Sequence, residues 1–168
     1  MFGLTLPARS LRCLWVMLAH YHGQRWNASE IGRSLGESPT TVRRHADILT
    51  GALVVRQLQP WFENLGKREV KSPNLYVRDA GLLHTLLGIH HFASLESNPK
   101  LGASWEGFVL EQMLAVTGDR NAHFWGTQSG VELDLLITLG GEQYGVEVKY
   151  SDVPRVTRSM RVAMADLR

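Results

Sequence analysis

The stretch Val131–Tyr150 reads V-E-L-D-L-L-I-T-L-G-G-E-Q-Y-G-V-E-V-K-Y, and it decides the fold of the second half of the chain. Apolar residues alternate with other residues up to Leu139, which is the period of a half-buried β-strand. The pair Gly140-Gly141 is typical of a two-residue hairpin loop. The alternation then resumes at Val146 on a second strand. The stretch therefore predicts an antiparallel hairpin.

The polar face of this hairpin carries the candidate chemistry. A two-residue loop places Leu135 opposite Val146 and Asp134 opposite Glu147, with both carboxylates and Lys149 on the face away from the valines. Two carboxylates directly opposite each other destabilise a ladder unless solvent, a shifted pKa or a cation compensates. Two interpretations stay open. The face is either an ordinary solvated surface or a site in which a divalent cation takes hard oxygen ligands and activates a water.

Length and composition describe an ordinary globular protein. The chain has 168 residues, of which 44% are hydrophobic and 20% are charged, enough to bury a core in one domain or two small ones. A net charge of +2 does not by itself indicate nucleic acid. The sequence has neither a secretory signal nor a membrane-length apolar run, so we expect a cytoplasmic protein without membrane contact. Cys13, the single cysteine, excludes an internal disulfide and is expected in the core.

The first part of the chain shows three helical segments. Apolar spacing over 11–19 predicts a helix that ends before Gly23. A capping-box pattern at 27–30 begins a second helix, and Ser38 followed by Pro39 begins a third that ends at Gly51 with Val42, Ala46 and Leu49 inward. An apolar strand follows. This order is typical of a winged helix-turn-helix.

In that motif the third helix enters the DNA groove, and the wing meets phosphate. The exposed face of the third helix would carry Thr40, Thr41, Arg43, Arg44 and His45. The wing would run through 53–58, return through 75–77 and present Lys67 and Arg68 at its tip. The alternative is a winged helix that contacts only protein, with a solvated basic loop.

The second part of the chain predicts helix, strand, hairpin and helix. A helix over 104–116 would bury a stripe and place Glu106 at the edge of it, able to lean over the sheet. A strand at 123–125 precedes the hairpin, and a last helix follows Pro154. A polar connector at 94–102 predicts two units, 1–95 and 96–168. The expected stripe consists of Trp105, Phe108, Val109, Gln112, Met113 and Val116, and the last helix would bury Met160, Met164 and Leu167.

These elements carry a family resemblance. A helix with Glu106, a strand with Asp134 and the E-x-K pattern at 147–149 resemble the restriction-endonuclease-like, or PD-(D/E)xK, superfamily. More closely, the whole chain resembles the domain of unknown function that lies C-terminal to the AAA-type P-loop module of many prokaryotic ATP-binding proteins. The segments that carry this resemblance are NASEIGRSLG at 27–36, VKSPNLYVRDAGLL at 70–83, WEGFV at 105–109, GVELDLLI at 130–137 and VEVK at 146–149.

The resemblance implies an α+β chain, a winged helix-turn-helix followed by an αβββα nuclease-like core, and a role for each site residue. Asp134, Glu147 and the carbonyl of Val148 would bind Mg²⁺ or Mn²⁺, and Glu106 would complete the shell. Lys149 would orient or deprotonate the water that hydrolyses a nucleic-acid phosphodiester. The alternative is a catalytically inactive regulatory domain of an ATPase that binds DNA or protein.

The sequence also departs from the family pattern. Leu133 stands where the superfamily motif has proline, and Gly126 where a basic residue is usual. No G-x-x-x-x-G-K-[ST] occurs, so this chain has no ATP site, and an ATPase module would act in cis or in trans. The pattern lacks the strand that follows the final helix, so we expect an incomplete core. Its open sheet edge would permit a homodimer.

Overall fold

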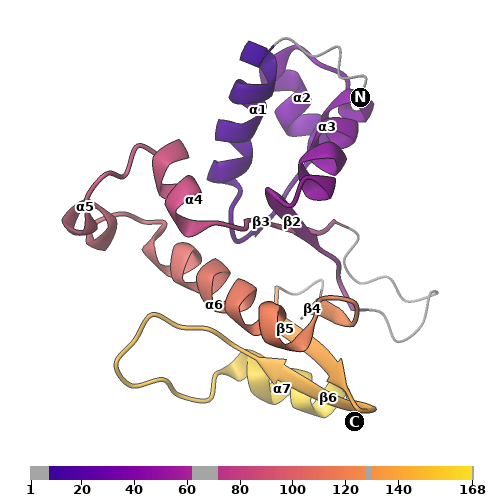
Figure 1. Ribbon diagram of the computed structural model, residues 1–168. Helices are drawn as coiled ribbons and strands as arrows, with labels where there is room; N and C mark the ends of the chain where they lie inside the picture. The colour runs from indigo at the N-terminus through magenta and orange to yellow at the C-terminus, as the bar shows by residue number, and fades with distance from the viewer. Residues whose placement is uncertain (1–7, 62–71, 128–129, 168) are drawn as a thin grey trace.

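The computed structural model describes residues 8–61, 72–127 and 130–167. Over these residues the chain is a mixed α and β protein, as expected, and it has seven helices and two three-stranded sheets (Figure 1). The first part contains α1 (Ala8–His20), β1 (Gln24–Arg25), α2 (Ala28–Leu35), α3 (Pro39–Gly51), β2 (Val55–Leu58), β3 (Asn74–Val77), α4 (Ala80–Leu86) and α5 (Phe92–Glu96). The second part contains α6 (Leu101–Thr117), β4 (Ala122–Gly126), β5 (Glu132–Leu139), β6 (Glu142–Val146) and α7 (Arg158–Asp166).

Local signals set the helices of the first part. The side chain of Asn27 accepts a hydrogen bond from the Ser29 N–H at 2.9 Å, and the Ser38 hydroxyl accepts one from the Thr41 N–H at 3.1 Å. These contacts satisfy N–H groups that a helix start leaves open. The helices pack on an antiparallel sheet of order β1-β3-β2 and enclose the first core cluster. Val42, Ala46 and Leu49 are buried as predicted.

The second sheet has the antiparallel order β4-β5-β6. Its hairpin register places Leu135 opposite Val146, as predicted, around a loop in which Gly140 and Gly141 have φ of 60° and 91°. These angles are easily adopted only by glycine. The ladder ends at Val146, so the predicted pairing of Asp134 with Glu147 is wrong as a ladder contact.

A β-bulge interrupts the pairing of β4 with β5. His123 pairs with Leu136 and Trp125 pairs with Leu133, so Asp134 and Leu135 lie opposite Phe124 alone. A bulge re-aims side chains and is common beside functional sites. Here Asp134 acts electrostatically on α6 and β3, and its neighbour Leu135 packs in the α6-side core. The predicted strict alternation, with Asp134 on the opposite face from Leu135, is therefore wrong.

Helices cover both faces of this sheet (Figure 1). Leu110 and Leu114 of α6 lie in one core cluster with Leu135, on one face of the sheet. Ala163 of α7 lies in another cluster with Leu133 and Leu136, on the opposite face. The stripe predicted for α6 is wrong, because Trp105, Phe108 and Val116 are exposed. The helix is apolar on most sides, so periodicity does not single out one face. The buried positions are Ser104, Gly107, Leu110, Glu111 and Leu114.

Three further predicted positions are corrected by the structure. Met164 is exposed on α7, where the small Ala163 takes the buried place. His45 is buried on α3 rather than presented with the arginines, and Cys13 is exposed on α1. In each case tertiary packing chose a different face of the helix from the one that local spacing indicated. No helix in the described ranges is long and apolar enough to cross a membrane.

The two parts of the chain share one core. Leu58 of β2 and Tyr76 of β3 belong to the same buried cluster as Leu110 of α6 and Phe124 of β4. The chain leaving β2 also pairs with β4, since the Phe124 N–H donates to the Gln59 carbonyl at 3.0 Å and the Trp61 N–H to the Phe124 carbonyl at 2.7 Å. In Figure 1, α6 runs between the N-terminal helices and the β4-β5-β6 sheet. Residues of β2 and β3 therefore complete the core that α6 and the β4-β5-β6 sheet form.

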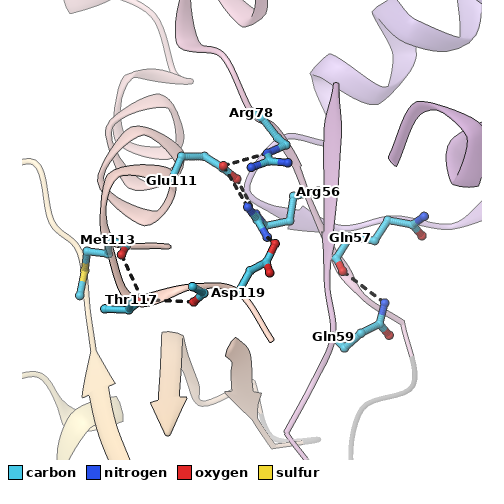
Figure 2. Close-up of polar contacts among 9 residues, drawn as sticks. Arg56, Gln57, Gln59, Arg78, Glu111, Met113, Thr117 and Asp119 are labelled. Atoms are coloured by element: carbon cyan, nitrogen blue, oxygen red, sulfur yellow. Dashed lines mark hydrogen bonds and ion pairs between the residues drawn. The ribbon is translucent and has the colours of Figure 1, made fainter. Parts of the chain in front are cut away.

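A charged network ties α6 to β2 and β3 (Figure 2). Glu111 accepts hydrogen bonds through both carboxylate oxygens from Arg56, with a 3.1 Å Nη2–Oε2 distance, and from Arg78 Nε at 2.9 Å. Arg56 also reaches Asp119 beyond the end of α6 at 3.0 Å. The network is largely buried apart from Asp119, so each charge depends on its partners.

Candidate functional site

Four charged side chains converge where α6 crosses the sheet. Asp134 lies at the bulge of β5 and raises the pKa of Glu106 on α6 through its charge, and Glu147 and Lys149, on the segment after β6, act electrostatically on Asp134. Lys149 Nζ lies 2.9 Å from Glu147 Oε1, and Asp134 Oδ2 accepts a hydrogen bond from the Val148 N–H at 2.7 Å. We call Glu106, Asp134, Glu147 and Lys149 the acidic-lysine cluster, and their roles as site residues stay a prediction.

Burial and mutual repulsion perturb the carboxylates. Burial, followed by the charge of Asp134, raises the pKa of Glu106 to about 7. Burial also raises the pKa of Asp134, with the Glu147 charge adding to it and the Val148 N–H opposing it. Carboxylates with pKa values perturbed by burial and by neighbouring charges are characteristic of functional sites.

Lys149 is held in its cationic form. Burial lowers its pKa, but the hydrogen bond to Glu147 and the charges of Asp134 and Glu106 outweigh that effect, so its pKa is raised. The side chain is half-exposed, so the ammonium can also be approached from solvent. A fixed, accessible cation beside carboxylates is suited to meet a phosphate group.

Tyr76 and His22 position Glu106, and neither was predicted as a site residue. The Tyr76 hydroxyl donates to Glu106 Oε1 at 2.6 Å, and burial, followed by the Glu106 charge, raises the pKa of Tyr76 well above its usual value. The His22 ring packs edge-on against Tyr76, with centroids 5.4 Å apart. His22 is itself fixed by the Val77 N–H, which donates to Nδ1 at 2.9 Å. Tyr76 comes from β3 and His22 from the turn between α1 and β1, and local sequence patterns do not report that these segments meet.

Two carboxylates of the cluster could bind a hard cation, but a third protein ligand is not placed beside them among the described residues. Within the described ranges no three His, Cys, Asp or Glu side chains gather closely enough to hold one ion. Asp134 and Glu147 nevertheless offer two carboxylates, and Glu147 Oε2 is buried without a hydrogen-bond partner. Mg²⁺ is commonly bound by one or two carboxylates together with waters and substrate phosphate. Val148 contacts Asp134 through its N–H, and the predicted role of its carbonyl stays a prediction.

The predicted nucleic-acid face is only partly described. Thr40, Arg43 and Arg44 are exposed along α3, whereas Thr41 is half-buried, with its hydroxyl 2.8 Å from that of Ser38. Lys67 and Arg68, predicted for the wing tip, lie outside the described residues. The α3 face therefore keeps two arginines and one threonine available to a ligand.

Two families of known sequences match the two parts of the chain. Residues 2–92 match the family described as domain of unknown function (DUF8612), and the chain belongs to that family. Residues 101–168 match a second family model, described as domain of unknown function (DUF4143). The division into units 1–95 and 96–168 stays a prediction.

Two mycobacterial proteins are similar over nearly the whole chain. They are the uncharacterized protein Mb2031c of Mycobacterium bovis and the uncharacterized protein Rv2008c of Mycobacterium tuberculosis, each 54% identical over 166 residues. The match covers 99% of this chain and 38% of each relative, so the chain spans well under half the length of these proteins. No solved structure is significantly similar.

Proposed function

We propose that this chain is the nucleic-acid-acting part of an ATPase-family protein, with the acidic-lysine cluster as a divalent-cation-dependent phosphodiester-hydrolysing site. The observation that carries the proposal is the convergence of Glu106, Asp134, Glu147 and Lys149 from α6, β5 and the segment after β6. Support for an ATPase context comes from the family matched by 101–168, which is typically associated with AAA ATPase-containing proteins.

Each residue of the cluster has a proposed task. Asp134 and Glu147 would hold Mg²⁺ or Mn²⁺, which when bound supplies charge stabilisation and lowers the pKa of a water. Lys149, kept cationic by Glu147, would orient the attacking water and offset charge on the phosphate. Glu106, steadied by the Tyr76 hydroxyl, would accept a proton at its carboxylate or support the cation.

The first part of the chain would deliver the nucleic acid. Support comes from the order α1-β1-α2-α3-β2-β3 with sheet order β1-β3-β2, which is the order that a winged helix-turn-helix would have. Arg43 and Arg44 on α3 would contact phosphate, and Lys67 and Arg68, which lie outside the described residues, are proposed to do the same. The hydrogen bonds of Glu111 on α6 with Arg56 of β2 and with Arg78, directly after β3, would hold the first part of the chain against the helix that carries Glu106.

A cleavage assay tests the proposal. The substrates are supercoiled, linear and single-stranded DNA and RNA, each with Mg²⁺ or Mn²⁺ and with EDTA. We expect cleavage that Asp134→Asn and Lys149→Ala each reduce at least about a hundredfold, as removal of one electrostatic catalytic group typically does. Asp152→Asn, an exposed carboxylate nearby in the chain, is the matched control and should cleave normally. No cleavage by the wild type, or equal cleavage by all variants, contradicts the site.

A second candidate is a binding module that does not cleave. The observation favouring it is that the described residues hold no three-ligand group, while Asp134 and Glu147 already pair with Val148 and Lys149. This candidate predicts salt-sensitive DNA binding that the double variant Arg43→Ala/Arg44→Ala abolishes, with Arg33→Ala on the neighbouring helix as control. Binding of this kind without cleavage would select the second candidate over the first.

A further inference from the structure

Three aromatic rings form an exposed cluster at the rim of the acidic-lysine cluster. Trp105 and Phe108 of α6 stack at 5.8 Å between centroids with an interplanar angle of 28°. Tyr150, which follows Lys149 in the chain, meets Trp105 edge-on at 6.1 Å and 73°. We call these three residues the aromatic platform.

The platform is not part of the protein's core. The three side chains are 40%, 44% and 52% exposed for Trp105, Phe108 and Tyr150, and none belongs to a buried cluster of the described residues. Exposed rings on this scale leave apolar faces in water, which costs free energy unless something covers them. Single exposed apolar residues need no explanation, but two exposed rings that both contact an exposed Trp105 do.

We propose that the aromatic platform stacks unpaired bases of a single-stranded nucleic acid whose phosphates approach Lys149. This deepens the proposed function, on which it rests, by naming the substrate class. Every base has a π-face that stacks on aromatic side chains, whereas the bases of a duplex are already stacked on each other. The Lys149 side chain is half-exposed and adjacent in sequence to Tyr150, so a base on the platform would place a backbone phosphate near its amino group.

The size of the platform argues against a protein partner. Half of three rings, at about 200 Å² each, amounts to roughly 300 Å². A stable protein interface buries about 800 Å² on each side. A strand of nucleic acid can instead use a few rings and a cation, because each stacked base contributes separately.

The test measures binding without cleavage, in EDTA and at low salt, by fluorescence anisotropy of labelled oligonucleotides. The three probes are oligo(dT), an abasic oligonucleotide of the same length and charge, and a duplex. We expect oligo(dT) to bind at least about tenfold more tightly than the abasic strand, because only the bases differ. Trp105→Ala and Tyr150→Ala should each lose roughly tenfold or more in affinity for oligo(dT) and little for the abasic strand.

Val116→Ala is the matched control, because Val116 lies on the same helix, is 88% exposed and is not part of the platform. It should bind like the wild type. Equal affinity for oligo(dT) and the abasic strand, or unchanged binding by Trp105→Ala, overturns the proposal. A wild-type dimer in sedimentation that Trp105→Ala converts to a monomer also overturns it, because a second copy would then cover the rings. If base-dependent binding fails while Asp134-dependent cleavage persists, the stacking proposal alone is wrong.

Discussion

Gly107 lies where α6 comes closest to His22. A Cβ built on this glycine would meet His22 Nε2, would lie 2.6 Å from His22 Cε1 and would lie 3.3 Å from Tyr76 Cδ1. His22 cannot give way easily, because it is buried and its ring nitrogens contact the Ala103 carbonyl at 3.0 Å and the Val77 N–H. We expect Gly107→Ala to lower the free energy of unfolding by about 1–3 kcal/mol in urea titrations.

Gly102→Ala is the control for this prediction. Gly102 lies on the same helix with nothing within 4 Å of an added Cβ. Alanine there should raise the free energy of unfolding of the protein by up to about 1 kcal/mol, because alanine favours the helix more than glycine does. Two variants of equal stability would show that the approach of α6 to His22 is looser than the structure indicates.

The Glu106 carboxylate makes stability depend on pH. Its pKa in the folded state is about 7, above its ordinary value of 4.5, so between these pH values the folded state binds more protons than the unfolded state. Its unfavourable contribution is therefore full above pH 7 and absent below pH 4.5. In EDTA we expect Glu106→Gln to be more stable than the wild type at about pH 8, on the order of 2 kcal/mol after allowing for its partial exposure.

That difference between the two proteins should shrink as the pH falls to about 5, where the wild-type carboxyl is protonated. Comparing the two proteins at each pH cancels the opposite contribution of His22, whose pKa burial lowers to about 4. The amide oxygen of the substituted glutamine can still accept the Tyr76 hydroxyl, so the variant removes charge and little else. A difference that does not change with pH would contradict a buried charge at Glu106.

The sequence indicated which residues belong to the candidate site, but it did not indicate how they are arranged. Asp134, Glu147 and Lys149 are singled out by an acidic residue on one strand and an E-x-K pattern beyond the hairpin loop. The structure places Lys149 Nζ 2.9 Å from Glu147 and the Val148 N–H 2.7 Å from Asp134. Tyr76 and His22 could not be predicted as partners of Glu106. Tyr76 lies 30 positions away in the chain, and nothing local to a tyrosine in an apolar strand reports which helix will cross it.

At the scale of elements, α6 is fastened to β2 and β3 by Glu111. Removing this carboxylate leaves the largely buried Arg56 and the partly exposed Arg78 with fewer partners, although Arg56 keeps Asp119. We expect Glu111→Ala to lower the free energy of unfolding by about 3 kcal/mol, because an uncompensated buried charge costs several kcal/mol. Asp119→Ala should cost under about 1 kcal/mol, since this side chain is 60% exposed. Equal effects in urea titrations would contradict the burial of the network.

The predictable elements are those set by neighbours in sequence. The caps at Asn27 and Ser38 and the hairpin around Gly140-Gly141 follow from local hydrogen-bonding and backbone rules, and the structure confirms them. The bulge in β5 depends on β4, and the buried face of α6 depends on the strands and side chains that it crosses. Such choices are made by tertiary contacts that outweigh a weak periodic signal.

At the scale of the whole molecule, the shared core predicts a single cooperative transition. Leu58 and Tyr76 complete the core that α6, β4 and β5 form, so the second part has no finished core of its own. Thermal unfolding followed by circular dichroism and by tryptophan fluorescence should give coincident midpoints. A polypeptide of residues 96–168 alone should lack dispersed NMR signals. Two separate transitions, or a folded 96–168 piece, would contradict this.

The same shared core has a consequence for synthesis on the ribosome. The first part emerges first and can close its own cluster around Ile31, Val42 and Leu75. Leu58 and Tyr76 then remain exposed until the residues that cover them, up to Ile137, have left the exit tunnel. During that interval the nascent chain presents an apolar surface that only its own later residues cover. We therefore expect chaperones to contact the growing chain during this interval, because its shared core is still incomplete.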